Sequence, residues 1–466
     1  MRNRTGWGGV LALACAGQLM VVLDVSVVNV ALPAIQHTLG FDPIDLQWVA
    51  NGYTLAFAGF LLVGGRLADV YGRRQVFLAG LALFTAASLT GGLSSDPAML
   101  VAARAAQGLA AAVLAPVTLT VLSTSYPDGA ARTRALAIWT AVSIAGGAGG
   151  NLLGGVLTEL LSWRSVLLIN VPIGAVAIIA ALRHLHGEQP QGAPARLDLP
   201  GALLASTGLV ALAYAITRAQ THGWATPATL ATLCLAVLAV GAFALIETRH
   251  ASAPLLPPAL LRNRAISLGN LAMLLAGASF QVPMWYFLTL YMQNVLHYSA
   301  LLAGIGFLPH TLLTLAVGLR VTPWLMQRIA HRALIAVGGL IAATGFAWQS
   351  LISTHSTYLS AILGPAVLIA VGGGLLNTPL TSTVISGVHA TDAGVASGLM
   401  NTAKQVGGAL GLGALIALAA NPNNPTPAEL VTGYHRAFLT MAALLLLTAA
   451  ITPLIPVHRD AVLGTH

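Results

Sequence analysis

Charged side chains inside long apolar stretches are the residues of this sequence best placed to do chemistry. Asp24 is the only acidic residue well inside such a stretch, and Arg104 and Lys404 are the basic ones. A carboxylate far from water is costly unless it is paired, solvated or protonated, so an acid that alternates between these states can carry a proton. Asp24 is therefore the first candidate for proton coupling. The alternative is a structural carboxylate that keeps the same partners permanently.

Two further side chains could act together with Asp24. Arginine keeps its charge, so Arg104 can hold Asp24 ionised or orient water beside it, unless it serves only static helix packing. His310 follows Pro309 in another apolar stretch, and an imidazole titrates near neutral pH. Its alternative role is a histidine hydrogen-bonded to a neighbour. We predict that Asp24, Arg104 and His310 take part in proton coupling.

The elements that must position these residues are long apolar segments. The 466-residue chain is 57% hydrophobic and only 7% charged, whereas a soluble domain is about 25% charged. This composition excludes a soluble enzyme, a secreted globular protein and a disordered protein. About 20 apolar residues cross the hydrocarbon core as one helix, so we predict an all-α polytopic membrane protein with 14 spans. The segments are 8–34, 47–67, 76–94, 98–122, 135–160, 165–182, 199–217, 227–246, 266–291, 300–319, 333–352, 357–382, 395–419 and 435–456.

The arginines predict how the chain is oriented. If the N-terminus is inside, sixteen arginines lie on the cytoplasmic side and only Arg164, Arg218 and Arg436 lie outside, in line with the excess of positive charge in cytoplasmic loops. Both termini are then cytoplasmic. Twenty of the 21 basic residues are arginine, a bias typical of GC-rich bacterial genomes, so we expect a bacterial cytoplasmic membrane. The net charge of +8 thus reflects orientation, and no basic run exceeds two residues, which argues against nucleic-acid binding. No phosphate-binding loop of the type GxxxxGK[ST] occurs, so we expect the energy to come from a gradient.

The loop between the second and third segments carries a specific signature. It reads Gly65-Arg-Leu-Ala-Asp69-Val-Tyr-Gly72-Arg73-Arg74, and this spacing resembles the loop motif of the major facilitator superfamily. Other stretches, spread over nearly the whole chain, resemble the fourteen-span drug:proton antiporters of that superfamily. They are Leu23-Asp24-Val-Ser-Val-Val-Asn29-Val-Ala-Leu-Pro33, Arg104-Ala-Ala-Gln107-Gly108, Trp163-Arg164, Ile169-Asn170-Val171-Pro172-Ile173-Gly174, Tyr291-Met-Gln-Asn-Val-Leu-His-Tyr-Ser299, Gly306-Phe-Leu-Pro309 and Asn401-Thr-Ala-Lys404-Gln405-Val-Gly407-Gly408.

The resemblance implies a fold and a role for the loop. Two six-helix bundles would enclose a midplane cavity and rock around it, with a two-helix insertion between them. The domains would be residues 1–183, 184–256 (the insertion) and 257–466. The motif residues Gly65, Asp69, Gly72, Arg73 and Arg74 would act in gating, in a chain that works as a monomer without a cofactor.

Small residues in the fifth segment form two columns at helical spacing. Gly146, Gly150 and Gly154 form one column, and Gly147, Asn151 and Gly155 form the next. Such columns allow close packing of helices in lipid. The antiporter family has Gly-Pro-x-x-Gly-Gly here, so Asn151 replaces a proline. Residues that could line a drug cavity are Asn29, Trp48, Tyr53, Gln107, Met284, Trp285 and Lys404, although aromatic residues also form belts at membrane interfaces and Lys404 could be structural.

The resulting functional hypothesis is export of amphipathic drugs or antibiotics in exchange for protons, by alternating access. The partners would be a small amphipathic organic substrate, protons and the lipid bilayer. A metabolite, sugar or lipid transporter on the same fold is the alternative, because a fold does not fix its substrate. A sensor or an enzyme within the membrane is a third possibility, but the sequence shows no output domain and no nucleophile and base in a catalytic arrangement.

Overall fold

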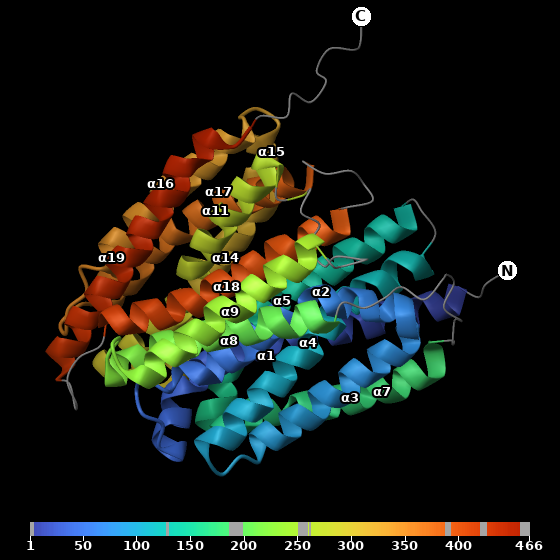
Figure 1. Cartoon of the computed structure of the whole chain (residues 1–466), viewed down its shortest axis with the longest axis horizontal. Coiled ribbons are helices and arrows are strands. Elements are labelled where there is room, and N and C mark those ends of the chain that lie inside the picture. The colour runs from blue at the N-terminus through green and yellow to red at the C-terminus, as the bar shows by residue number, and fades with distance from the viewer. Residues whose placement is uncertain are drawn as a thin grey trace, which may run out of the picture.

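The computed structural model describes residues 4–126, 130–185, 199–249, 260, 262–386, 393–419 and 426–456. These residues form helices joined by short turns, and no strand occurs among them (Figure 1). The main helices are α1 (Arg4–Leu39), α2 (Gln47–Tyr71), α3 (Arg73–Gly92), α4 (Pro97–Ser125), α5 (Ala130–Leu160), α6 (Trp163–Leu168), α7 (Asn170–His184), α8 (Leu199–His222), α9 (Pro227–Arg249), α11 (Arg264–Phe280), α12 (Pro283–Leu290), α13 (Ala300–Gly306), α14 (Leu308–Ala316), α15 (Thr322–Met326), α16 (His331–Gln349), α17 (Gly364–Ser386), α18 (Ala393–Ala419) and α19 (Pro427–Ile451).

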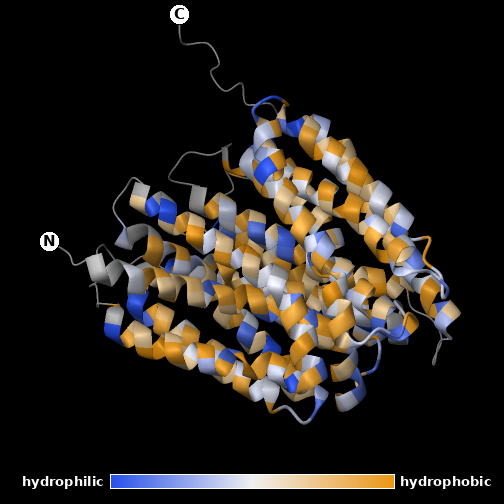
Figure 2. Ribbon diagram, turned by 180° about the vertical axis from the view of Figure 1, so that it is seen from behind, coloured by the Kyte–Doolittle hydropathy of each residue, from blue (hydrophilic) through white to orange (hydrophobic). Residues whose placement is uncertain are grey.

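The lengths and hydropathy of the helices confirm a multi-span membrane protein. Among the described residues, 12 helices are long and apolar enough to cross a membrane, and α5 makes a thirteenth if its two parts, bent by 41° between Gly147 and Gly149, count as one span. Helix α2 occupies the predicted segment 47–67. Hydrophobic residues cover the helices along their length, and hydrophilic residues gather toward their ends (Figure 2). The count of 14 spans stays a prediction.

Several predicted segments differ from the helices in their limits or continuity. The first segment was expected to end near Pro33, but α1 continues to Leu39 with Pro33 inside it, as membrane helices tolerate. The segment 266–291 is broken between α11 and α12, where Pro283 starts the second helix. The segment 300–319 is divided into α13 and α14, with Pro309 in the first turn of α14. Pro283 and Pro309 thus mark two breaks that hydropathy alone does not reveal.

The same packing pattern occurs in the helices before and after the α8–α9 pair. Helix α1 packs on α5 and α3 packs on α4, while α11 packs on α18 and α16 packs on α17 in corresponding positions. Glycines allow close packing in the α1–α5 pair and in the corresponding α11–α18 pair. A Cβ on Gly154 of α5 would lie 2.5 Å from the Val27 carbonyl oxygen of α1, and a Cβ on Gly407 of α18 would lie 2.0 Å from the Leu274 carbonyl oxygen of α11. We call α1–α7 the N-terminal group and α11–α19 the C-terminal group. The predicted limits at 183 and 256 lie beside stretches outside the described residues and stay predictions.

The two groups touch at one end of the molecule and diverge toward the other (Figure 1). We call the end with the α1–α2 loop, residues 40–46, the loop end, and the opposite end, with Arg4 and Pro456, the terminal end. Near the loop end, Gln293 Nε2 donates to the Val30 carbonyl 2.8 Å away, and the Leu301 N–H donates to Glu159 Oε2 at 2.9 Å. These bonds join the N-terminal group to the C-terminal group.

Glycines bring the backbones of α5 and α13 into direct contact, and these helices belong to different groups. A Cβ on Gly155 of α5 would lie 2.6 Å from the Ala300 carbonyl oxygen, and a Cβ on Gly304 of α13 would lie 2.6 Å from that of Asn151. Real Cβ atoms do not approach backbone so closely, so only glycine fits at this crossing. The first column of α5 therefore packs on α1, whereas Asn151 and Gly155 of the second column face α13 in the C-terminal group.

Candidate functional site

The Asp24 carboxylate lies at the centre of a buried hydrogen-bond network. Asp24 has no exposed surface, and both its oxygens have partners. Oδ1 accepts from Gln107 Nε2 at 2.8 Å and from Asn170 Nδ2 at 3.0 Å, and Oδ2 accepts from Arg104 Nη1 in a salt bridge. A buried charge is stable only when it is paired and hydrogen-bonded, and these three donors satisfy that requirement for the ionised carboxylate.

Arg104 is held from several directions. Its Nε donates to the Val49 carbonyl at 2.9 Å, and its Nη1 also donates to Gln107 Oε1 at 2.9 Å. The guanidinium carbon lies 4.7 Å from the centre of the Tyr53 ring, a cation–π geometry. Arg104 therefore ties α4 to α1 through Asp24 and to α2 through Val49 and Tyr53.

The network joins five helices of the N-terminal group. Asp24 lies on α1, Arg104 and Gln107 lie one turn apart on α4, and Asn170 is the first residue of α7. Gln107 Nε2 also donates to the hydroxyl of Ser88 on α3 at 2.8 Å, and Val49 and Tyr53 belong to α2. A change in the charge of Asp24 would therefore alter hydrogen bonds and contacts that link α1, α2, α3, α4 and α7.

Two members of this network, Asn170 and Ser88, were not predicted as site residues. Asn170 stands out in the sequence only as part of the family-like stretch 169–174, and Ser88 lies in an otherwise apolar segment. Both side chains are fully buried. A buried polar residue at mid-segment is a signal for such partners, but the pairing depends on α3 and α7 lying beside α4 and α1, which the sequence does not reveal.

The partners of Asp24 differ in what they can do when the carboxylate takes up a proton. An amide side chain carries both a donor and an acceptor, so Gln107 and Asn170 can serve either protonation state after rotation of the amide. Asn170 Oδ1 is buried without a hydrogen-bond partner in this part of the structure, and it could accept from a protonated Asp24. Arg104 has only donors, so it is matched to the ionised form alone.

Helix α1 connects this network to the crossing of α5. A Cβ on Gly150 would lie 2.5 Å from Ser26 Cβ and 3.4 Å from the Leu23 carbonyl oxygen, and one on Gly146 would lie 2.9 Å from Leu19 Cδ1. These contacts flank Asp24 on both sides. The same helix α5 contacts the C-terminal group through Gly155. Helices α1 and α5 therefore connect the Asp24 network to the contact between the two groups.

His310 lies outside this network. It is on α14 of the C-terminal group, and its ring meets that of Trp285 edge-on, with the centroids 5.4 Å apart. Its Nδ1 is buried without a hydrogen-bond partner among the described residues. None of the bonds described above for Asp24 involves it, so the coupling role of His310 stays a prediction that this arrangement does not support directly.

The loop motif forms the tight connection between α2 and α3. Gly72 separates the two helices with φ of 86°, a conformation that glycine adopts without strain. Arg74 Nη2 donates to the Leu182 carbonyl of α7 at 3.4 Å. A Cβ on Gly65 would lie 3.8 Å from Pro116, and Arg73 begins α3. The side chain of Asp69 lies outside the described part of the chain, so the gating role of this motif stays a prediction.

The predicted cavity residues are found in two kinds of environment. Trp48, Trp285 and Lys404 are half-buried, and Trp48 packs among α2, α8 and α18 with its ring centroid 6.1 Å from that of Tyr214. Asn29 and Met284 are buried. Tyr53 and Gln107 are also buried, as parts of the Asp24 network. In this arrangement, four of the seven candidates are therefore enclosed by protein.

Comparison with known proteins gives a consistent result. The cephamycin export protein of Amycolatopsis lactamdurans is 56% identical over 96% of this chain and 92% of that protein. The puromycin resistance protein of Streptomyces alboniger is 40% identical over 96% and 90%. The tetracenomycin C resistance and export protein of Streptomyces glaucescens is 36% identical over 89% and 76%.

The fold has a counterpart among solved structures. The crystal structure of the POT family transporter PepTSo matches with a TM-score of 0.71 at 14% identity, over 98% of both chains. At this identity the match concerns the fold alone. Residues 14–412 match the Major Facilitator Superfamily, a range that holds the Asp24 network, the α2–α3 loop and the α5–α13 crossing. With relatives of this similarity along almost its entire length, the chain belongs to the Major Facilitator Superfamily.

Proposed function

We propose that this protein exports an amphipathic antibiotic across the bacterial cytoplasmic membrane in exchange for protons, by alternating access. The observation that carries the proposal is the buried Asp24 carboxylate, shared between Arg104, which serves only the ionised form, and two amides that can serve both forms. The names of the relatives support antibiotic export. The 56% identity to the cephamycin export protein favours a cephamycin-type β-lactam.

In the proposed cycle, the proton changes how tightly the N-terminal group is held together. Protonation neutralises Asp24 and leaves Arg104 without its counter-charge, which is unfavourable away from water. The network then favours an arrangement in which Arg104 finds other acceptors or water. Two discrete arrangements of a packed network are what a coupled transporter needs, because packed interfaces switch rather than deform continuously.

The proposed coupling path runs through α1 and α5. Asp24 and the contacts of Gly146 and Gly150 are on the same stretch of α1, and Gly155 of α5 meets the backbone of α13. A shift of α1 against α5 would therefore reach the contact that closes the loop end. We assign the loop end to the outside and the terminal end to the cytoplasm, because the predicted orientation places most arginines at the terminal end.

Transport into inside-out membrane vesicles tests this function. Vesicles that contain the protein, energised to acidify their interior, are expected to accumulate cefoxitin, a cephamycin, and to lose it when a protonophore is added. Vesicles from the same host without the protein are the control. Accumulation that a protonophore does not affect would contradict proton antiport. No accumulation of any antibiotic, across cephamycins, puromycin and other amphipathic drugs, would contradict drug export.

Lys404 supplies a second prediction, about substrate charge. It lies on α18, half-buried, and no salt bridge pairs it with an acid within the described residues. Cephamycins carry a carboxylate, which could provide this missing counter-charge. We expect Lys404→Gln to weaken the apparent affinity for cefoxitin by roughly ten- to a hundredfold, because a hydrogen bond to a charged group contributes about 1.5–3 kcal/mol and about 1.4 kcal/mol is a factor of ten.

The control for Lys404 is a conservative change and an uncharged substrate. Lys404→Arg should retain most of the affinity, and the methyl ester of cefoxitin should be transported equally by the protein and by Lys404→Gln. The measurement is the concentration dependence of uptake into vesicles. If Lys404→Gln weakens the apparent affinity for cefoxitin and for its methyl ester equally, Lys404 supports the fold and does not bind the substrate carboxylate.

A further inference from the structure

A cavity opens at the terminal end of the C-terminal group, remote from the loop end where the two groups touch. Its volume is about 380 Å³, and it is lined by the turn between α15 and α16, by the last turns of α17, by the start of α11 and by the chain after α19. The lining residues are Ala265, Met326, Gln327, Arg328, Ile329, Ala330, His331, Arg332, Ile335, Ser382, Thr383, Ile455 and Pro456. Four segments distant in sequence therefore share one cavity.

The ionisable residues of this cavity are two arginines and one histidine. Arg328, His331 and Arg332 lie within five consecutive residues, in the turn before α16 and its first two positions, and no acidic residue occurs among the lining residues. Arg328 and Arg332 are exposed, and no salt bridge of the described chain joins either to a carboxylate. Such a concentration of unpaired positive charge favours an anion.

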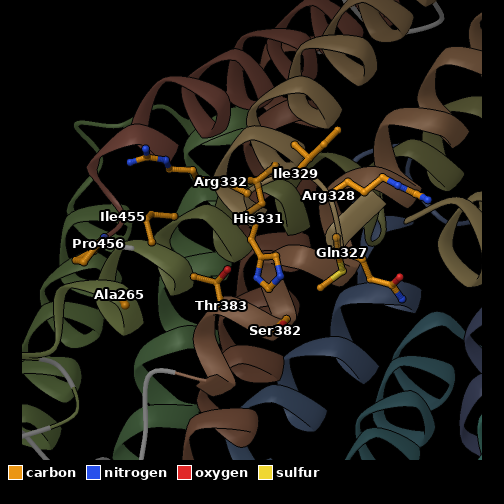
Figure 3. A pocket seen from close by; sticks show the side chains of 13 residues that line it. Ala265, Gln327, Arg328, Ile329, His331, Arg332, Ser382, Thr383, Ile455 and Pro456 are labelled. Carbon is orange, nitrogen blue, oxygen red and sulfur yellow. The ribbon is translucent and has the colours of Figure 1, made fainter. Parts of the chain in front are cut away.

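The basic side chains of the cavity surround the hydroxyl-bearing residues Ser382 and Thr383. In Figure 3 the His331 ring points toward Ser382 and Thr383, while Arg328 and Arg332 extend to opposite sides of it. The two guanidinium groups therefore border the cavity rather than meet at one point. Planar guanidinium groups recognise phosphate through paired hydrogen bonds, and two of them at opposite rims suit a headgroup larger than inorganic phosphate.

The surroundings of the cavity match a membrane surface. Trp324 is 52% exposed and its ring lies under Arg328, with the guanidinium carbon 4.0 Å from the ring centre. Ile329, which lines the cavity, is exposed as well. Exposed tryptophan is typical of the membrane–water interface, and apolar side chains next to the arginines offer a surface along which acyl chains could lie.

We propose that this cavity binds the phosphate-bearing headgroup of an anionic phospholipid. Basic pockets between helices at the cytoplasmic side of membrane proteins are suited to such headgroups. A headgroup bound here would contact the ends of α11, α16 and α17 and the segment after α19 at once. It would thus fasten the terminal end of the C-terminal group as a unit, independently of the Asp24 network and of the substrate.

Binding of defined lipids to the purified full chain tests the proposal. The protein is kept in a neutral detergent and titrated with phosphatidylglycerol, phosphatidylcholine or inorganic phosphate, and bound lipid is counted by native mass spectrometry. We expect tight binding of phosphatidylglycerol only. The variant Arg328→Gln/Arg332→Gln should bind it roughly 25-fold more weakly, since one arginine near an anionic lipid surface is worth about a factor of five.

A matched variant separates this cavity from general surface charge. Arg183→Gln/Arg249→Gln removes two exposed arginines from the terminal ends of α7 and α9 and should leave the binding unchanged. The variant Arg328→Lys/Arg332→Lys should retain most of it, which controls for misfolding of the glutamine variant. Equal loss in both glutamine variants, or equal binding of phosphatidylcholine, would overturn the proposal. Full displacement of the lipid by inorganic phosphate would show that the cavity binds phosphate alone and would contradict the proposal of a phospholipid ligand.

Discussion

Replacing Asp24 with asparagine is expected to abolish proton-driven export while leaving the shape of the side chain almost unchanged. The amide cannot balance the charge of Arg104, which is 2% exposed and receives its only described counter-charge from Asp24. Removing one partner of a buried ion pair costs about 3–5 kcal/mol, so a lower thermal stability is expected as well. The measurement is uptake of cefoxitin into energised inside-out vesicles, together with a melting curve of the purified variant.

Two further variants make this result specific. Asp42→Asn removes an exposed carboxylate from the α1–α2 loop and should transport normally. Asp24→Glu keeps the charge and should retain part of the activity. If Asp24→Asn exchanges labelled for unlabelled substrate across the membrane, the variant is folded and only its coupling is lost. Full proton-driven export by Asp24→Asn would contradict the role assigned to this carboxylate.

Replacing Gly155 with leucine is expected to stop transport by a different route. Its Cβ would lie 2.6 Å from the Ala300 carbonyl oxygen and 2.9 Å from Leu301 Cα, so the N-terminal and C-terminal groups could no longer meet at the loop end. Overpacking costs about 1–3 kcal/mol, and about 1.4 kcal/mol changes an equilibrium tenfold. The variant should therefore favour the arrangement that is open at the loop end.

The same helix offers a control for this change. A Cβ on Gly149 meets nothing within 4 Å, so Gly149→Leu should be tolerated. Opening can be measured in a protein without Cys15 and Cys234 that carries Val30→Cys, because Val30 is fully buried where Gln293 crosses to it. A membrane-impermeant thiol reagent should label this cysteine faster with Gly155→Leu than with Gly149→Leu. Equal labelling and normal transport in both would show that the glycine crossing does not control closure.

Much of the architecture and the centre of the site could be predicted from the sequence. Long apolar segments of about 20 residues indicate spans directly, and their approximate positions agree with the helices. Asp24 and Arg104 stand out because charges inside such segments are rare and costly, whereas Gln107, three residues after Arg104, was predicted only as a residue that could line the drug cavity. The structure joins these three side chains through direct hydrogen bonds.

The remaining partners depend on tertiary packing, which a single sequence does not encode visibly. Asn170 reaches Asp24 from 146 positions along the chain, and no local pattern links the two. The second glycine column predicts a close helix neighbour, yet nothing in the sequence says that Gly155 meets α13 rather than α1. His310 was grouped with Asp24 by the chemistry of its imidazole and the position of its segment, and its ring packs edge-on against Trp285, so its role in proton coupling stays a prediction.

Proton movement in proteoliposomes tests the central claim most directly. The purified protein is reconstituted with a pH-sensitive dye inside the vesicles, and cefoxitin is added to the outside without an imposed gradient. Entry of the drug should drive protons out, so the interior should become more alkaline with the wild-type protein and should not change with Asp24→Asn, although that variant still exchanges the drug. An equal pH change with Asp24→Asn, or drug entry by the wild-type protein without any proton movement, would contradict proton antiport through Asp24.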